Sequence, residues 1–166
     1  MKIAIISDSH DNITNIYKFL DYAKKQNVEM IIHCGDVCAP SVLKELGDKF
    51  GGQIHLVYGN VDGDKVMMEK IAQSFNHFTI HGEIGKVDVD GKKIVLTHFL
   101  ETARELAETG KYNYVFYGHN HKPWQELVGN TQLINPGTLA GLFAKATFAL
   151  WDTKDREPKL ILLEQI

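Results

Sequence analysis

The N-terminal part of the sequence alternates three times between a short β-branched run and a longer segment whose apolar residues recur at helical spacing. The runs read KIAIIS, EMIIHC and QIHLVY, and the segments that follow them span residues 12–26, 40–50 and 65–75. Pro40 suits the first turn of the second helix. Three strand–helix units in succession predict a parallel sheet covered by helices.

Strand signals dominate after Thr79. The stretch KVDVDGKKIVLTH reads as two alternating strands joined at Asp90-Gly91, a pair typical of a hairpin turn. A helix is expected at 101–109, ended by Gly110, and YNYVFYG reads as a buried strand. WQELV, TQLIN, TFALWD and LILLE then predict a strand-rich C-terminal part. We therefore expect a second sheet packed on the first, in one domain spanning residues 1–166.

Composition excludes several classes of protein. The chain has a net charge of −3 and no long run of like charge, so we expect no binding to duplex nucleic acid. Asp8 and His10 interrupt the apolar start, which is neither a signal peptide nor a membrane span. Cys34 and Cys38 lack metal or redox spacing and read as free thiols, so we expect a cytoplasmic protein. The sequence leaves the oligomeric state open, including a homo-oligomer.

Polar residues follow five of the predicted strands, in the blocks DSHD, GD, GNVD, a single histidine and GHNH. Because the carboxyl ends of parallel strands share one sheet edge, we expect these side chains to meet there. The set comprises Asp8, His10, Asp36, Asn60, His98, His119 and His121. Burying it without a cation is costly, and it is too large for one tetrahedral ion. It predicts two divalent ions about 3.5–4 Å apart that share a carboxylate.

These blocks, in this order, resemble the calcineurin-like metallophosphoesterase family. INPGT at residues 134–138 narrows the resemblance to the small bacterial and archaeal phosphodiesterases of that family. The resemblance implies an α/β fold, a four-layer α/β/β/α sandwich of two packed mixed sheets flanked by helices. It also implies a phosphoric diester hydrolase with two divalent ions per chain, of manganese, nickel, iron or zinc, acting on a small or nucleotide-like phosphodiester.

The resemblance assigns a role to each residue of the set. Asp8, His10 and His121 are implied to hold one ion, Asn60, His98 and His119 to hold the other, and Asp36 to bridge them. A hydroxide shared by the two ions would attack phosphorus in line, with Asp36, Asn60 and His119 as the catalytic residues. The two cations would lower the pKa of that water and neutralise charge on the phosphoryl oxygens.

The sequence departs from the family pattern at Val61, where many members carry a histidine that protonates the leaving oxygen. Such a group is typically worth about 10²–10⁴-fold in rate. Phe99 and Leu100 stand where some small relatives have a second histidine. One reading is an enzyme that acts on diesters with good leaving groups, or that takes a proton from water, His33 or Tyr58. The other is a metal-binding scaffold with weak or no catalysis that binds protein partners.

A few further residues carry expectations of their own. Asp62 is expected to support the site or a turn, with capping of the following helix as the simpler role. Trp124 could stack on a nucleobase, but a tryptophan at the start of a strand is more often in the core. The remaining histidines outside the blocks read as structural or exposed. A third reading, nuclease activity on short single strands, stays open.

Overall fold

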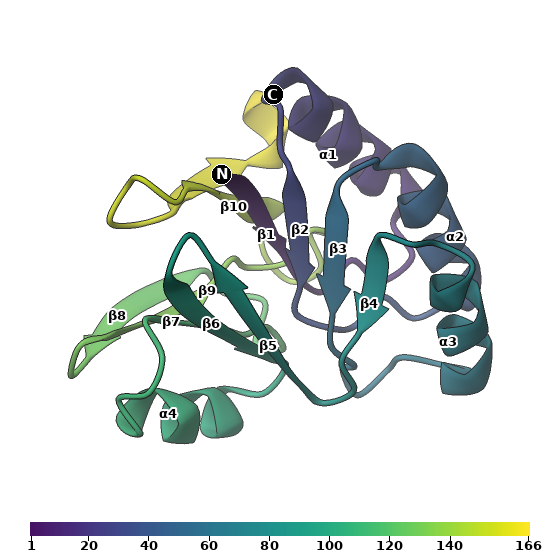
Figure 1. The fold of residues 1–166 in the computed structure, drawn as a ribbon. Helices are drawn as coiled ribbons and strands as arrows, with labels where there is room; N and C mark the ends of the chain where they lie inside the picture. The colour runs from purple at the N-terminus through teal and green to yellow at the C-terminus, as the bar shows by residue number, and fades with distance from the viewer.

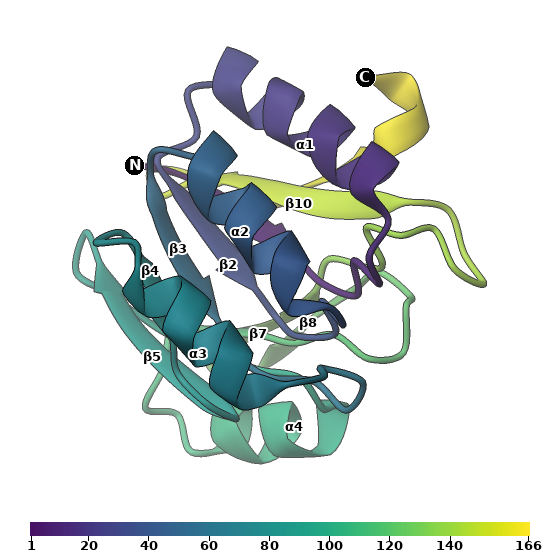
Figure 2. The same cartoon turned by 90° about the vertical axis from the view of Figure 1, so that its right-hand side faces the viewer.

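In the computed structural model, which describes residues 1–166, two β-sheets pack face to face and helices cover their outer faces (Figure 1). The six-stranded sheet has the order β11-β10-β1-β2-β3-β4, and the five-stranded sheet has the order β5-β6-β7-β9-β8. Helices α1, α2 and α3 lie on the first sheet, and α4 lies under the second (Figures 1 and 2). This α/β/β/α arrangement confirms the predicted fold class.

The first sheet is formed by β1 (Lys2–Ile6), β2 (Met30–His33), β3 (Gln53–Leu56), β4 (Phe78–Ile80), β10 (Thr147–Asp152) and β11 (Lys159–Leu162). The second is formed by β5 (Ile84–Val89), β6 (Lys92–Thr97), β7 (Tyr114–Phe116), β8 (Trp124–Val128) and β9 (Thr131–Asn135). The helices are α1 (Ile13–Lys25), α2 (Pro40–Lys49), α3 (Lys65–Gln73) and α4 (Leu100–Glu108).

The helices begin and end within two residues of their predicted bounds, because the chain carries clear end signals. The Asn12 side chain caps α1 by accepting a hydrogen bond from Asn15 N, and Pro40 opens α2. Asp64 caps α3, so the capping role considered for Asp62 is wrong. None of these helices is long and apolar enough to cross a membrane.

The first sheet is mixed, whereas the strand–helix units predicted a parallel one. Strands β1 to β4 are parallel, but β10 pairs antiparallel with β1 on the other side, where Ile5 faces Ala149. Strand β4 escaped prediction because three residues are too short to show a period. The LILLE strand ends at Leu162, and residues 163–165 form a 3-10 helix. The hairpin is confirmed, with Asp90 and Gly91 at positive φ.

Alternate residues of β1 serve two different cores, which explains why the strand is apolar throughout. Ile3 and Ile5 pack between the two sheets, in a cluster that includes Trp151. Ala4 and Ile6 face the helices on the other side of the same sheet. Because a slip of one residue would exchange these two sets of side chains, the register of β1 is strongly specified. The loops that follow the strands are thereby held in fixed positions.

Candidate metal centre

The structure brings all seven predicted ligands together. Six of them form two groups of three, and within each group the potential ligand atoms lie within 4.8 Å of one another: Asp8, His10 and His121, and then Asp36, His98 and His119. Asn60 joins the second group, since its Oδ1 lies 3.1 Å from His98 Nε2. These residues follow β1, β2 and β3 of one sheet and β6 and β7 of the other. The expected meeting at one sheet edge is therefore wrong: both sheets contribute.

The loops of the two sheets are tied to each other directly. Asp8 N donates to Gly35 O at 3.0 Å, which joins the loops after β1 and β2. Gly118 N donates to His98 O at 3.0 Å, which joins the loops after β6 and β7. His119 N donates to Asp8 Oδ2 at 3.1 Å and so links the two sheets. The ligand groups thus sit on a continuous hydrogen-bonded frame.

Two of the three pairs in the first group have the spacing of a coordination shell, and the third, His10 Nε2 to Asp8 Oδ1, is wider at 4.0 Å. His10 Nε2 lies 3.2 Å from His121 Nε2, and Asp8 Oδ1 lies 3.4 Å from His121 Nε2. Ligands placed about 2.1 Å from an ion at tetrahedral or octahedral angles are separated by roughly 3.0–3.4 Å. His121 Nδ1 donates to Leu142 O at 3.0 Å, so the lone pair of this imidazole is on Nε2 and faces the group.

The second group gathers atoms that are all acceptors when the His98 imidazole is neutral. His98 Nδ1 donates to Cys34 O at 2.7 Å, which leaves the Nε2 lone pair pointing inward. That lone pair meets Asn60 Oδ1 at 3.1 Å and Asp36 Oδ2 at 3.3 Å. Facing acceptors repel one another unless a cation, either a proton or a metal ion, lies between them. The donor set therefore fits a divalent cation that accepts both nitrogen and oxygen.

Asp36 lies between the two groups. Its Oδ2 is 3.3 Å from His98 Nε2 and 3.9 Å from His10 Nε2, while Oδ1 accepts a hydrogen bond from Val61 N at 3.0 Å. Burial would raise the pKa of Asp36, but hydrogen bonds from His98 and from Val61 N hold that pKa below its ordinary value. Burial would lower the pKa of His98, yet the Asp36 carboxylate raises it above the ordinary value. This carboxylate is ionised and lies between the two ligand groups.

The backbone of the site is unusual. Five of the seven residues have positive φ, namely Asp8 at 52°, His10 at 40°, Asp36 at 58°, His119 at 72° and His121 at 58°. Non-glycine residues rarely adopt this conformation, and such outliers cluster at functional sites, where the surrounding structure enforces them. The strain is evidence that these loops are shaped for a task other than stability.

Gly59 is required for the close approach of two loops. A Cβ atom at this position would lie 2.0 Å from Asp36 Oδ1 and 2.6 Å from Asp36 N. Any side chain would therefore displace the carboxylate that faces both groups. The glycine of the GN block is explained by this contact with Asp36.

Asp62 supports Asp36 through the backbone. Its carboxylate accepts hydrogen bonds from Asp36 N at 3.1 Å, Val37 N at 2.7 Å, Cys38 N at 2.9 Å and Gly59 N at 2.7 Å. One buried acid thus holds the loop after β2 against the loop after β3. The supporting role predicted for Asp62 is observed, although no sequence pattern indicated that four amides would share this carboxylate.

The INPGT segment braces the same frame. Asn135 Nδ2 donates to Gly118 O at 2.9 Å and to Asn120 Oδ1 at 2.8 Å. Thr138 Oγ1 donates to Asp8 O at 2.9 Å. The segment therefore fixes the loop that carries His119 and the loop that carries Asp8. Only the family resemblance had singled it out, because neither side chain has a chemical signature of its own.

The two residues considered as proton donors are both engaged elsewhere. His33 is fully buried; its Nδ1 accepts a hydrogen bond from Gly35 N at 3.2 Å, so its Nε2 donates to Ser9 Oγ at 3.0 Å. The Tyr58 hydroxyl donates to Lys65 O at 3.3 Å, and burial raises the pKa of Tyr58 to about 12. Neither group is an available acid, so the proton must come from another source.

Burial of neutral His33 predicts a loss of stability in acid. Burial lowers the pKa of His33 from 6.5 to about 4, so the unfolded chain binds more protons between these values. The contribution of His33 to stability should fall as the pH falls through this window, by about 2 kcal/mol between pH 7.5 and pH 5. Urea unfolding of metal-free protein measures the slope, and His33→Gln should make it shallower by this amount, leaving the contribution of His55, whose pKa burial also lowers to about 4. An equal slope in both proteins would contradict this account.

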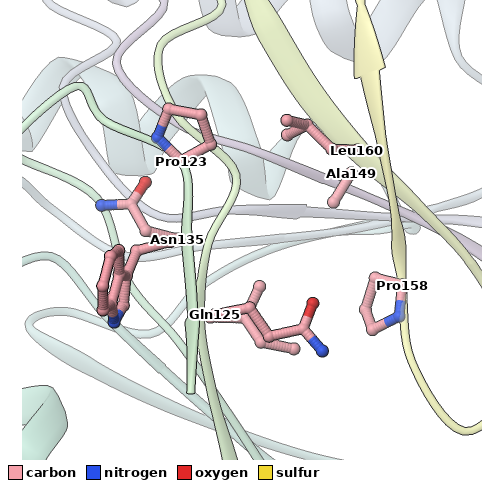
Figure 3. Close-up of a pocket in the computed structure, with 8 residues that line it drawn as sticks. Pro123, Gln125, Asn135, Ala149, Pro158 and Leu160 are labelled. Atoms are coloured by element: carbon pink, nitrogen blue, oxygen red, sulfur yellow. The ribbon is translucent and has the colours of Figure 1, made fainter.

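Trp124 does not lie in the core, contrary to prediction. Its side chain is 57% exposed at the start of β8, an edge strand whose outer edge pairs with no other strand. It borders a cavity of about 200 Å³ between β8 and β9 on one side and β10 and β11 on the other (Figure 3). The cavity is lined by Pro123, Trp124, Gln125, Ile134, Asn135, Ala149, Pro158 and Leu160. None of the seven ligand candidates borders it.

Known proteins resemble this chain over nearly its whole length. The model of the calcineurin-like phosphoesterase superfamily domain matches residues 1–156. Phosphodiesterase MJ0936 of Methanocaldococcus jannaschii is 35% identical over 167 residues, which cover 99% of this chain and 100% of that protein. Phosphodiesterase YfcE of Escherichia coli is 24% identical over 153 residues, which cover 84% of this chain and 80% of that protein.

Solved structures agree with the architecture. The structure of a novel archaeal phosphodiesterase superposes with a TM-score of 0.90 at 33% identity, covering 98% of this chain and 99% of that one. Vps29 of Entamoeba histolytica, complexed with zinc, superposes with a TM-score of 0.70 at 17% identity, covering 98% of this chain and 99% of that one. At that identity the second likeness shows the fold alone.

Proposed function

The chain belongs to the calcineurin-like phosphoesterase superfamily and is a phosphoric diester hydrolase, and from this premise we propose that it hydrolyses a small or nucleotide-like phosphodiester with the help of two divalent ions. One observation carries the proposal. Asn60 Oδ1 and Asp36 Oδ2 converge within 3.1–3.3 Å of His98 Nε2, where a cation, either a proton or a metal ion, is needed between them, and Asp36 also faces His10 of the other group. The whole chain would act as one domain, in a cytoplasmic setting that suits its two free thiols.

The candidate ligands would bind the two ions in two groups. Asp8, His10 and His121 would hold one ion, and Asn60, His98 and His119 would hold the other, with Asp36 shared. Bound ions would lower the pKa of a coordinated water and neutralise negative charge on the phosphoryl oxygens. Cys34 O and Leu142 O would orient the imidazoles of His98 and His121. Manganese, nickel, iron and zinc all accept this donor set.

The substrate should have a leaving group that departs without protonation by a general acid. Val61 follows Asn60 and offers no proton, and neither His33 nor Tyr58 is available as an acid. A leaving group of low pKa departs as an anion, so it tolerates the absence of a general acid. We therefore propose aryl or similarly acidic esters as the substrates that this site turns over best.

Metal removal tests the proposed function. Protein stripped with chelator should lose its activity on bis-p-nitrophenyl phosphate, and manganese or nickel should restore it. The release of p-nitrophenolate measures turnover, and metal analysis of the same samples relates activity to the number of ions bound. An unchanged rate after complete stripping, or no turnover with any divalent ion, would defeat the proposal.

The scaffold reading is favoured by a separate observation, the exposure of apolar side chains beside the ligand groups. Val61 is 44% exposed and Phe99 is 39% exposed. Vps29, which shares the fold, shows that the architecture occurs outside proteins named as phosphodiesterases. Activity of the metal-loaded protein would decide against this reading, since a scaffold needs no turnover.

A further inference from the structure

Phe143 stands at the edge of the first ligand group with no packing of its own. Its side chain is 98% exposed, and its backbone has a φ of 60°. The ring lies 5.9 Å from the His121 imidazole at an interplanar angle of 26°, which is a stacked arrangement. The preceding carbonyl, Leu142 O, accepts the hydrogen bond from His121 Nδ1, so the backbone next to Phe143 is tied to a candidate ligand. Nothing in the fold requires an aromatic residue at this position.

Phe99 occupies the corresponding place beside the second group. Its ring lies 5.0 Å from the His98 imidazole and 4.9 Å from that of His119, in edge-on geometry, and its side chain is 39% exposed. His119 is itself exposed, so this ring borders the open side of the site. Each ligand group therefore has one accessible aromatic ring beside it.

A phosphodiester bound at the two groups carries two substituents that project away from phosphorus. Exposed rings are well suited to stack on planar substituents, and aromatic pairs add affinity beyond the area that they bury. A small aliphatic substituent has no flat face and gains little from either ring.

We propose that Phe99 and Phe143 select phosphodiesters with a planar aromatic substituent, either an aryl group or a nucleobase. This inference rests on the proposed function and names its substrate class. It agrees with the missing proton donor at Val61, because phenolic leaving groups are acidic. The two rings would act in binding, without contact to the reacting atoms.

Three diesters that release the same p-nitrophenolate test the proposal by their second substituent. We expect metal-loaded wild-type protein to prefer thymidine 5′-p-nitrophenyl phosphate and bis-p-nitrophenyl phosphate over methyl p-nitrophenyl phosphate in kcat/KM. The double variant Phe99→Leu/Phe143→Ala should lose at least about 5-fold on the preferred esters relative to the methyl ester. Phe143→Tyr keeps the ring and should keep the preference. A higher kcat/KM for the thymidine ester than for bis-p-nitrophenyl phosphate would identify a nucleobase as the preferred substituent, and the reverse order would identify an aryl group.

A binding measurement separates this inference from the proposed function. Calorimetry with metal-loaded protein should show phenylphosphonate binding more tightly than methylphosphonate, and the double variant should lose that difference. Equal binding of the two ligands by wild-type protein, or a preference that survives in the double variant, would overturn the inference while leaving hydrolysis intact. Absence of turnover on all three diesters would instead overturn the proposed function. Leu160→Ala, an exposed apolar position on β11, should change neither result.

Discussion

Replacing Asp36 by alanine should remove both metal ions from the protein and lower diester turnover by more than about 10²-fold. Its Oδ2 is the one carboxylate oxygen that faces both groups, at 3.3 Å from His98 Nε2 and 3.9 Å from His10 Nε2. Loss of a residue that merely supports a ligand typically costs about 10–100-fold in metal affinity or activity, so loss of a shared ligand should cost more.

Asp8 provides the matched control. Its Oδ1 lies 3.4 Å from His121 Nε2 and 4.0 Å from His10 Nε2, so it faces the first group only. Asp8→Asn keeps an acceptor for the hydrogen bond from His119 N and should lose only the ion of that group. We therefore expect two ions per chain in wild-type protein, one in Asp8→Asn and none in Asp36→Ala, by metal analysis after dialysis.

Two results would contradict the shared role of Asp36. Retention of two ions by Asp36→Ala would show that the carboxylate is not needed by either site. Loss of both ions from Asp8→Asn as well would show that any substitution among these loops abolishes binding of both ions. Circular dichroism of the metal-free variants checks that they remain folded, because Asp36 Oδ1 also accepts a hydrogen bond from Val61 N.

Much of the fold could be predicted, because its signals are local. Asn12 and Pro40 mark helix starts, and Asp90-Gly91 specifies a hairpin within a few residues. The pairing of β10 with β1 could not be foreseen, since it joins residues about 150 positions apart and no local pattern records it. The mixed first sheet came from the resemblance, whereas the strand–helix units alone favoured a parallel sheet.

The candidate ligands could be predicted from the sequence better than the residues and loops that hold them in place. Asp8 and His119 could be recognised in the sequence, because a charged or imidazole side chain directly after an apolar strand is an unusual pattern. The contribution of both sheets was not foreseen, since crevice rules describe the end of one sheet. Phe143 carried no signal, because a phenylalanine normally reads as core, and its 98% exposure is visible only in the structure.

Removing the Asp62 carboxylate should destabilise the metal-free protein by at least about 4 kcal/mol. The carboxylate accepts hydrogen bonds from four backbone amides, and Asp62→Ala would leave them without this partner in a buried place. Each unsatisfied buried donor costs about 1–3 kcal/mol, so the three buried amides and the partly buried Cys38 N together reach the stated figure. Because a domain of ordinary stability has only about 5–15 kcal/mol, the loss would be plain in urea unfolding.

Asp64→Ala is the natural control, two residues further along the same loop. Asp64 caps α3 by accepting a hydrogen bond from Met67 N at an exposed position, and loss of such a cap costs about 1 kcal/mol. Equal destabilisation by the two variants would mean that the amides around Asp62 find other partners once the carboxylate is gone. A much larger loss in Asp62→Ala would show that a single buried acid sets the position of Asp36. The geometry of the metal centre would then depend on a residue that touches neither ion.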